Sequence, residues 1–315
     1  MDAIEALGLP ESRWADVEGP VHYREWSGSA GGPTFVCVHG LGGSHLNWAA
    51  VAAGLARKGR VIAMDLAGFG LTEPGDRGTS VGANWRLLHG FIEVLRLPPA
   101  ILVGNSMGGM LSLIEAAHSP ERVEGLALVD AAFPRAKAVR GQPNPRVAAA
   151  FALYSSNRAG RWVVEERAKR LGPEGLVRET LRLCAADPSS IDPALVAAHV
   201  ELARQRMTFE YAAPAFLSAA RSIFRSQVFP TKYRALVEAV QAPALVIHGS
   251  RDALVPVASA REAAVLHANW KLVVFDDLGH IPQMEAPARW LGAVDDWLDE
   301  LAADGGEGAG AEDAG

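Results

Sequence analysis

A serine flanked by glycines is the residue of this sequence best suited to act as a nucleophile. The segment Gly104-Asn105-Ser106-Met107-Gly108-Gly109 contains the pattern G-x-S-x-G, after an apolar run at residues 100–103 and before an apolar helical pattern. A serine in a sharp turn between a strand and a helix needs small neighbours, which the glycines supply. The helix that follows directs amide N–H groups at developing negative charge. The pattern therefore predicts Ser106 as a nucleophile.

A serine hydroxyl needs a base that accepts its proton, and His280 is the histidine whose position fits this role. It lies in Leu278-Gly279-His280-Ile281-Pro282, directly after an apolar run at residues 271–275. A loop that leaves the end of a strand there can reach the serine turn. Other histidines fit surface, helical or locally satisfied positions better, namely His22, His118, His199, His267 and His248. We therefore predict His280 as the general base.

The third member of such a group is a carboxylate that orients the histidine and stabilises its charged form. Asp252 follows the apolar run at residues 244–248 in Gly249-Ser250-Arg251-Asp252 and gives the chain order Ser, Asp, His. Asp130 also ends a predicted strand and remains the alternative acid. We predict Asp252 in this role.

Two further glycine-containing loops follow predicted strands. His39-Gly40-Leu41-Gly42-Gly43 can turn backbone N–H groups inward, so we predict the N–H groups of Leu41 and Met107 as the oxyanion hole. We expect His39 to be hydrogen-bonded within its own loop. Asp65 begins a second glycine-rich turn, at residues 65–70, and is expected to cap that turn rather than to catalyse.

These loops require a sheet that places them along one edge. Short apolar runs without polar alternation are typical of strands buried on both faces, and they occur at residues 34–38, 60–64, 100–103, 125–129, 244–247 and 271–275. Helical patterns lie between them, for example at residues 47–57, 84–97 and 107–118. The sequence therefore predicts an α/β fold with a mostly parallel, doubly wound sheet.

The alternation of strands and helices stops between residues 133 and 241. This segment is rich in Arg and Ala, contains several prolines and lacks a buried-strand pattern. It is too long for one crossover, so we predict a helical cap at residues 133–241 inserted into a core domain formed by residues 1–132 and 242–302. Residues 303–315 contain no apolar side chain besides alanine and are expected to be disordered.

Composition limits the partners of the protein. The net charge of −6 argues against nucleic acid, and no stretch approaches about 18 consecutive apolar residues, so no membrane span is expected. The N-terminus lacks the features of a secretory signal, and two cysteines, Cys37 and Cys184, fit a reducing compartment, which predicts a cytoplasmic location. No metal-binding spacing occurs, so we expect no metal and no cofactor, and a small hydrophobic substrate as the partner.

Taken together, these motifs resemble the α/β-hydrolase fold superfamily along nearly the whole chain. The segments that carry the resemblance are residues 39–43, 65–70, 104–109, 249–252 and 279–280. The resemblance implies a capped serine hydrolase with Ser106, Asp252 and His280 as its catalytic residues.

The turn Gly-Asn-Ser-Met-Gly-Gly is similar to those of capped carboxylesterases and of meta-cleavage-product hydrolases, which cut carbon–carbon bonds in vinylogous diketones. The latter commonly have a tryptophan near the catalytic histidine, whereas Ile281-Pro282-Gln283-Met284-Glu285 follows His280 here. Relatives that open epoxides or remove halides use aspartate where this chain has Ser106. The resemblance implies an esterase acting on small to medium hydrophobic esters through an acyl-enzyme. The alternatives are a carbon–carbon bond hydrolase and a ligand receptor, as some plant hormone receptors of this fold are.

Overall fold

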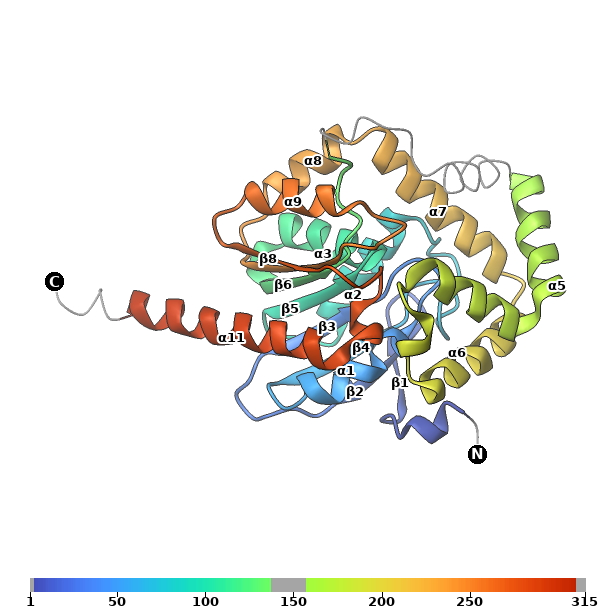
Figure 1. Ribbon diagram of the computed structural model, residues 1–315, viewed down its shortest axis with the longest axis horizontal. Helices are drawn as coiled ribbons and strands as arrows, with labels where there is room; N and C mark the ends of the chain where they lie inside the picture. Colours follow the sequence, from blue (N-terminus) through green and yellow to red (C-terminus); the bar gives the residue numbers. More distant parts are fainter. Residues whose placement is uncertain (1–2, 137–156, 310–315) are drawn as a thin grey trace.

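The structure is a computed structural model that describes residues 3–136 and 157–309. Its centre is an eight-stranded sheet with the order β1-β2-β4-β3-β5-β6-β7-β8 (Figure 1). The strands are β1 (Ser12–Asp16), β2 (Pro20–Trp26), β3 (Thr34–Val38), β4 (Arg60–Met64), β5 (Ala100–Asn105), β6 (Val123–Val129), β7 (Ala244–Gly249) and β8 (Trp270–Phe275). Strands β3 to β8 pair in parallel, and β1 and β2 pair antiparallel. This arrangement confirms the predicted α/β fold with a mostly parallel, doubly wound sheet.

The parallel strands are mostly apolar because both faces of the sheet are covered. In β3, Val36 and Val38 face one core cluster, whereas Phe35 and Cys37 face the other. The helices in the described residues are α1 (Ala49–Leu55), α2 (Val81–Val94), α3 (Met107–His118), α5 (Asn157–Cys184), α6 (Pro193–Arg206), α7 (Ala212–Val228), α8 (Thr231–Glu238), α9 (Val257–Val265), α10 (Pro282–Glu285) and α11 (Pro287–Ala309), with short 3-10 helices η1 (Glu5–Leu7), η2 (His45–Trp48), η3 (Pro120–Arg122) and η4 (Pro188–Ser190). None of these helices is long and apolar enough to span a bilayer.

Helix α11 covers the face of the sheet that also packs against α1. Its side chains Trp290, Val294 and Trp297 are buried in that cluster, which explains their helical spacing. The helix continues through Ala309, although the sequence predicts disorder from residue 303. Adding residues to an existing helix needs no new nucleus, so poor helix formers can extend it. Residues 310–315 of the predicted tail lie outside the described residues.

Helices α5 to α8 occupy the described part of the segment between β6 and β7. Helix α5 is interrupted at Gly172, where φ is 64° directly before Pro173. Figure 1 shows α5, α6 and α7 gathered on the side of the molecule opposite to the C-terminal end of α11. The helical content agrees with the sequence pattern, and a cap domain at residues 133–241 stays a prediction, since residues 137–156 lie outside the described residues.

Candidate active site

Ser106 lies at the junction of β5 and α3, and its backbone has a conformation that non-glycine residues rarely adopt. Its φ is 54° and its ψ is −114°, in a positive-φ region where side chains cause strain. Hydrogen bonds fix this geometry, because Ser106 N donates to Val129 O at 3.0 Å and Ala132 N donates to Ser106 O at 2.9 Å. Strain of this kind is concentrated at functional sites, and it occurs at the predicted nucleophile.

The glycines around Ser106 are required by close backbone contacts. A Cβ atom on Gly108 would lie 1.9 Å from the carbonyl oxygen of Val38, and one on Gly104 would lie 2.6 Å from Gly108 O. A Cβ atom on Gly40 would lie 3.0 Å from the Cβ of Ser106. The serine turn is therefore packed directly against the glycine loop that follows β3, where the sequence predicts an oxyanion donor.

The structure brings Asp252 and His280 together. Asp252 Oδ2 accepts a hydrogen bond of 2.6 Å from His280 Nδ1, and both side chains are buried. Asp252 Oδ1 accepts from the N–H groups of Leu254 and Val255 at 2.7 and 3.0 Å. Burial opposes the charged form, but the charge and the hydrogen bond of His280 outweigh it and hold the pKa of Asp252 below its usual value. This contact fixes His280 with Nδ1 as a donor, which leaves Nε2 as the basic nitrogen.

The side chain of Asn105 joins the serine turn to the histidine loop, residues 278–282, which contains His280. Asn105 Nδ2 donates 3.0 Å hydrogen bonds to the carbonyl oxygens of both Val129 and His280. Asn105 directly precedes Ser106 and is itself buried. The last residue of β5 therefore holds the backbone of His280 beside the predicted nucleophile.

A second support of the histidine loop comes from Glu285, which the sequence did not single out. Its Oε1 accepts from Gly279 N at 2.8 Å, and its Oε2 accepts from Ala186 N at 2.8 Å. His280 N also donates to Cys184 O at 2.6 Å. The loop that contains His280 is thus bound to the end of α5 as well as to the sheet.

Asp130, the alternative acid, lies near Asp252 but makes different contacts. Its Oδ1 accepts from Gly249 N at 2.9 Å, and its backbone has a φ of 44°. His248, at the end of β7, directs Nε2 to Val255 O at 3.0 Å. The residue hydrogen-bonded to His280 is Asp252.

The loop after β3 is held by His39, as the sequence predicts. His39 Nδ1 donates to Gly40 O at 2.7 Å, and Nε2 accepts from Leu66 N at 3.0 Å. Burial lowers the pKa of His39 to about 4, so it remains neutral. Met107 is the first residue of α3 and is buried, and Leu41 packs against the core. Their role as oxyanion donors stays a prediction.

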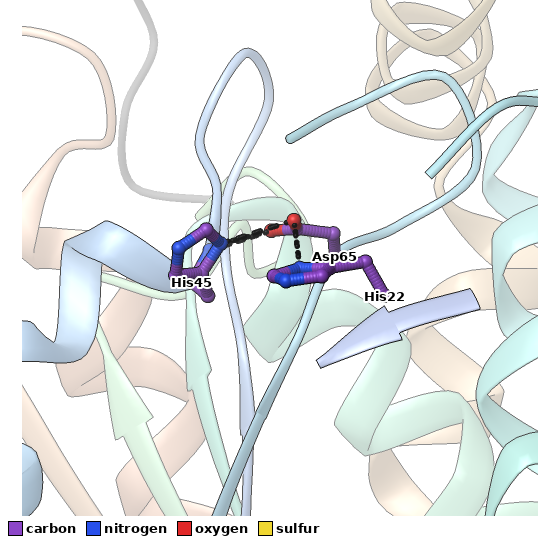
Figure 2. Close-up of side chains that lie close together, drawn as sticks. All are labelled: His22, His45 and Asp65. Atoms are coloured by element: carbon purple, nitrogen blue, oxygen red, sulfur yellow. Dashed lines mark hydrogen bonds and ion pairs between the residues drawn. The ribbon is translucent and has the colours of Figure 1, made fainter. Parts of the chain in front are cut away.

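Asp65 lies in a buried cluster with His22 and His45 (Figure 2). Its carboxylate accepts from His22 Nδ1 at 2.7 Å, from His45 Nδ1 at 3.0 Å and from His45 N at 2.7 Å. It also caps the glycine turn, because Leu71 N donates to Oδ2 at 2.9 Å. Burial raises the pKa of Asp65, but the two histidines outweigh burial and hold this pKa well below its usual value.

The expectation that His22 lies in a surface-like position is wrong. His22 is on β2, which pairs in the sheet interior beside β4, and its Nε2 is hydrogen-bonded to Ser12 Oγ at 2.9 Å. The side chains of His22, His45 and Asp65 are of the types that bind metal ions. Here four N–H groups already donate to the carboxylate of Asp65. We interpret this cluster as a hydrogen-bonded support for the segment after the glycine loop.

Comparisons with known proteins match most of the chain. A family model described as the alpha/beta hydrolase fold matches residues 33–287. The chain is 29% identical over 276 residues to 2-hydroxymuconate semialdehyde hydrolase of Pseudomonas sp. (strain CF600), an alignment that covers 86% of this chain and 89% of the relative.

Solved structures show the same fold. A proposed lipase from Acinetobacter baumannii AYE is similar with a TM-score of 0.75 at 23% identity, covering 96% of this chain and 95% of that chain. A thermophilic esterase from Thermogutta terrifontis is similar with a TM-score of 0.65 at 25% identity, covering 92% and 99%. The likeness therefore spans nearly the whole chain rather than one motif.

Proposed function

The chain belongs to the α/β-hydrolase fold family, and we propose that this hydrolase cleaves a carboxylic ester of a small to medium hydrophobic substrate through an acyl-enzyme. The observation that carries the proposal is the 2.6 Å hydrogen bond between Asp252 and His280, whose backbone Asn105 joins to the strained turn at Ser106. A nucleophile, a base and an orienting acid in this arrangement are what acyl transfer requires.

In the first half of the reaction, Ser106 Oγ attacks the ester carbonyl carbon while His280 Nε2 accepts the hydroxyl proton. The carbonyl oxygen becomes an oxyanion, which accepts hydrogen bonds from the N–H groups of Leu41 and Met107. When the tetrahedral intermediate collapses, the bond to the alcohol oxygen breaks and His280 gives that oxygen the proton. Asp252 stabilises the imidazolium that exists between the two proton transfers.

The second half returns the enzyme to its starting state. Water attacks the acyl-Ser106 carbonyl, and His280 Nε2 accepts a proton from that water. Collapse of the second intermediate releases the carboxylic acid, and the proton returns from His280 to Ser106 Oγ. The net reaction consumes one water and one ester and needs no cofactor.

A second candidate is hydrolysis of a carbon–carbon bond by the same residues. The relative from Pseudomonas sp. (strain CF600) is named a 2-hydroxymuconate semialdehyde hydrolase, which favours this reaction. We place the ester reaction first because Ile281 and Pro282 follow His280 where carbon–carbon bond hydrolases commonly have a tryptophan.

Parallel assays of two substrate classes separate the candidates. The wild-type enzyme is given a chain-length series of p-nitrophenyl esters and, separately, a dienone product of aromatic ring cleavage. The proposal predicts that kcat/KM for the best ester exceeds that for the dienone, and the chain-length optimum reports the size of the acyl site. A preference for the dienone would overturn the proposal in favour of carbon–carbon bond cleavage.

The state of the cysteines is relevant to the cellular compartment of the enzyme. Cys37 and Cys184 are both free thiols, and burial raises the pKa of Cys184 to about 12. Free, unreactive thiols support a cytoplasmic enzyme.

A further inference from the structure

Two buried carboxyl groups lie close together beside His248, and the mechanism above uses only one of them. Asp130 follows β6 and Asp252 follows β7, and an oxygen atom of each lies within 4.8 Å of the other and of His248 Nε2. Neither side chain has exposed surface. Two carboxyl groups this close in a buried site do not both ionise unless a cation compensates them.

A cation on His280 is hydrogen-bonded to Asp252 and can compensate only one of the two carboxylates. His248 Nε2 donates to Val255 O at 3.0 Å, and burial lowers the pKa of His248, so its imidazole is neutral. Two further groups act on this pair electrostatically, namely the carboxyl group of Glu285 and the thiol of Cys184. Glu285 adds negative charge, and Cys184 is uncharged. One carboxylate of the pair therefore remains uncompensated, and a proton on one of the two aspartates removes that charge.

The hydrogen bonds show which aspartate holds that proton. Asp252 accepts three hydrogen bonds, from His280 Nδ1 and from two backbone N–H groups, all of which favour its charged form. Asp130 accepts one, from Gly249 N to Oδ1, and its buried Oδ2 has no hydrogen-bond partner among the described residues. Burial and the charge of Asp252 raise the pKa of Asp130 well above its usual range. A proton on Asp130 Oδ2 satisfies the atom that otherwise lacks a partner.

We propose that Asp130 is a positioning residue that acts through Asp252: it is a neutral carboxylic acid whose Oδ2–H donates a hydrogen bond to the Asp252 carboxylate. That bond holds Asp252 against His280 and keeps the net charge of the aspartate pair at minus one. The kinetic part of this inference rests on the proposed function, whereas the protonation of Asp130 does not.

The backbone conformation of Asp130 determines which substitutions can be made there without strain. Its φ of 44° is tolerated by Asn and by Gly, so both substitutions fit the backbone. Asp130→Asn keeps a neutral side chain with one acceptor for Gly249 N and one donor for Asp252. Asp130→Gly removes the group without forcing a Cβ atom into the positive-φ region. Asp276→Asn, at an exposed aspartate after β8, is the matched control.

The direct measurement is infrared spectroscopy of the full-length enzyme at neutral pH. A carbonyl-stretch band of a protonated carboxyl group is expected in the wild type and in Asp276→Asn, and its loss is expected in Asp130→Asn. Identical spectra for the wild type and Asp130→Asn in this region would overturn the proposal. This readout needs no turnover, so it stays decisive even if no ester is hydrolysed.

Ester kinetics then test whether Asp130 acts through Asp252. Because a hydrogen bond to a charged group is lost, Asp130→Gly should lower kcat at least about tenfold with little change in KM. Asp130→Asn should restore kcat to within about threefold of the wild type, and adding Asp130→Gly to Asp252→Asn should cause no further loss. Equal damage by Asn and Gly, or losses that multiply in the double variant, would contradict the proposal.

Discussion

The side-chain amide of Asn105 donates a 3.0 Å hydrogen bond to the backbone carbonyl of His280, 175 residues later in the chain. The same amide donates to Val129 O, so one buried side chain connects β5, β6 and the histidine loop. Because Asn105 is covalently bonded to Ser106, this contact sets the position of the proposed base relative to the proposed nucleophile. Its geometry is the basis of our first prediction.

Removing this amide should impair turnover more than binding. In Asn105→Ala the backbone of His280 loses its donor, and a shift of the base by about 1 Å can cost about a hundredfold in rate. We expect kcat for a p-nitrophenyl ester to fall about tenfold to a hundredfold while KM changes little. Asn269→Ala is the matched control, because its amide also donates to a carbonyl, that of Gln241, but on the surface. A similar loss in both variants would show that the effect is not local to the site.

Gly108 should tolerate no larger residue. An added Cβ atom would lie 1.9 Å from Val38 O, so α3 and β3 would have to separate. Gly108→Ala should lower the free energy of unfolding by about 3 kcal/mol, measured by urea denaturation, and should abolish ester hydrolysis. Gly292→Ala, where an added Cβ atom meets nothing within 4 Å, should leave both properties unchanged or add up to about 1 kcal/mol of stability. Normal stability of Gly108→Ala would refute the close packing described here.

The pH dependence of stability should contain a contribution from His39. Burial lowers the pKa of His39 from 6.5 to about 4, so below pH 6.5 the unfolded chain binds a proton that the folded chain does not. The contribution of His39 to the free energy of unfolding is therefore fully present above pH 6.5. It decreases by about 3 kcal/mol as the pH approaches 4.

Urea titrations between pH 4 and 7 check this prediction. His39→Gln retains an acceptor for Leu66 N but cannot titrate, so its stability should fall less steeply over this range than that of the wild type. If the free energy of unfolding depends on pH in the same way in both proteins, His39 contributes nothing to the loss of stability at acidic pH.

Glu285 should stabilise both the fold and the position of His280. Its carboxylate accepts from Gly279 N, Ala186 N and Asp187 N, and the amide of Glu285→Gln has only one oxygen for these donors. We expect a loss of about 2 kcal/mol in the free energy of unfolding and a lower kcat. Glu300→Gln removes an exposed ion pair with Lys271 and should cost at most about 1 kcal/mol with no change in kcat. Equal effects of the two variants would count against the role of Glu285.

The parallel part of the fold could be predicted because it is buried on both faces. Adjacent residues such as Val36 and Cys37 enter different core clusters, so these strands consist mainly of consecutive apolar residues. The first two strands could not be recognised in this way. They form the antiparallel edge, where polar residues such as Arg24 and Glu25 interrupt the apolar ones, and the positive φ of Glu18 and Gly19 turns one strand into the other.

The residues proposed for catalysis could be selected because each follows a strand, which places Ser106, Asp252 and His280 along one edge of the sheet. Their supports could not, since these are contacts between distant segments. Glu285 accepts a hydrogen bond from Ala186 N, just after the end of α5, and Asp130 lies near Asp252 only because β6 and β7 are neighbours. Spacing along the chain contains no signal for such contacts, and the burial of His22 against Asp65 is a contact of the same kind.

The most direct test of the central claim is the rate of p-nitrophenyl ester hydrolysis by Ser106→Ala compared with the wild type. The two proteins should first be shown to unfold at the same urea concentration. If Ser106 is the nucleophile, kcat should fall by about a millionfold, to a rate indistinguishable from the background. A folded Ser106→Ala enzyme that retains the wild-type rate would contradict the account.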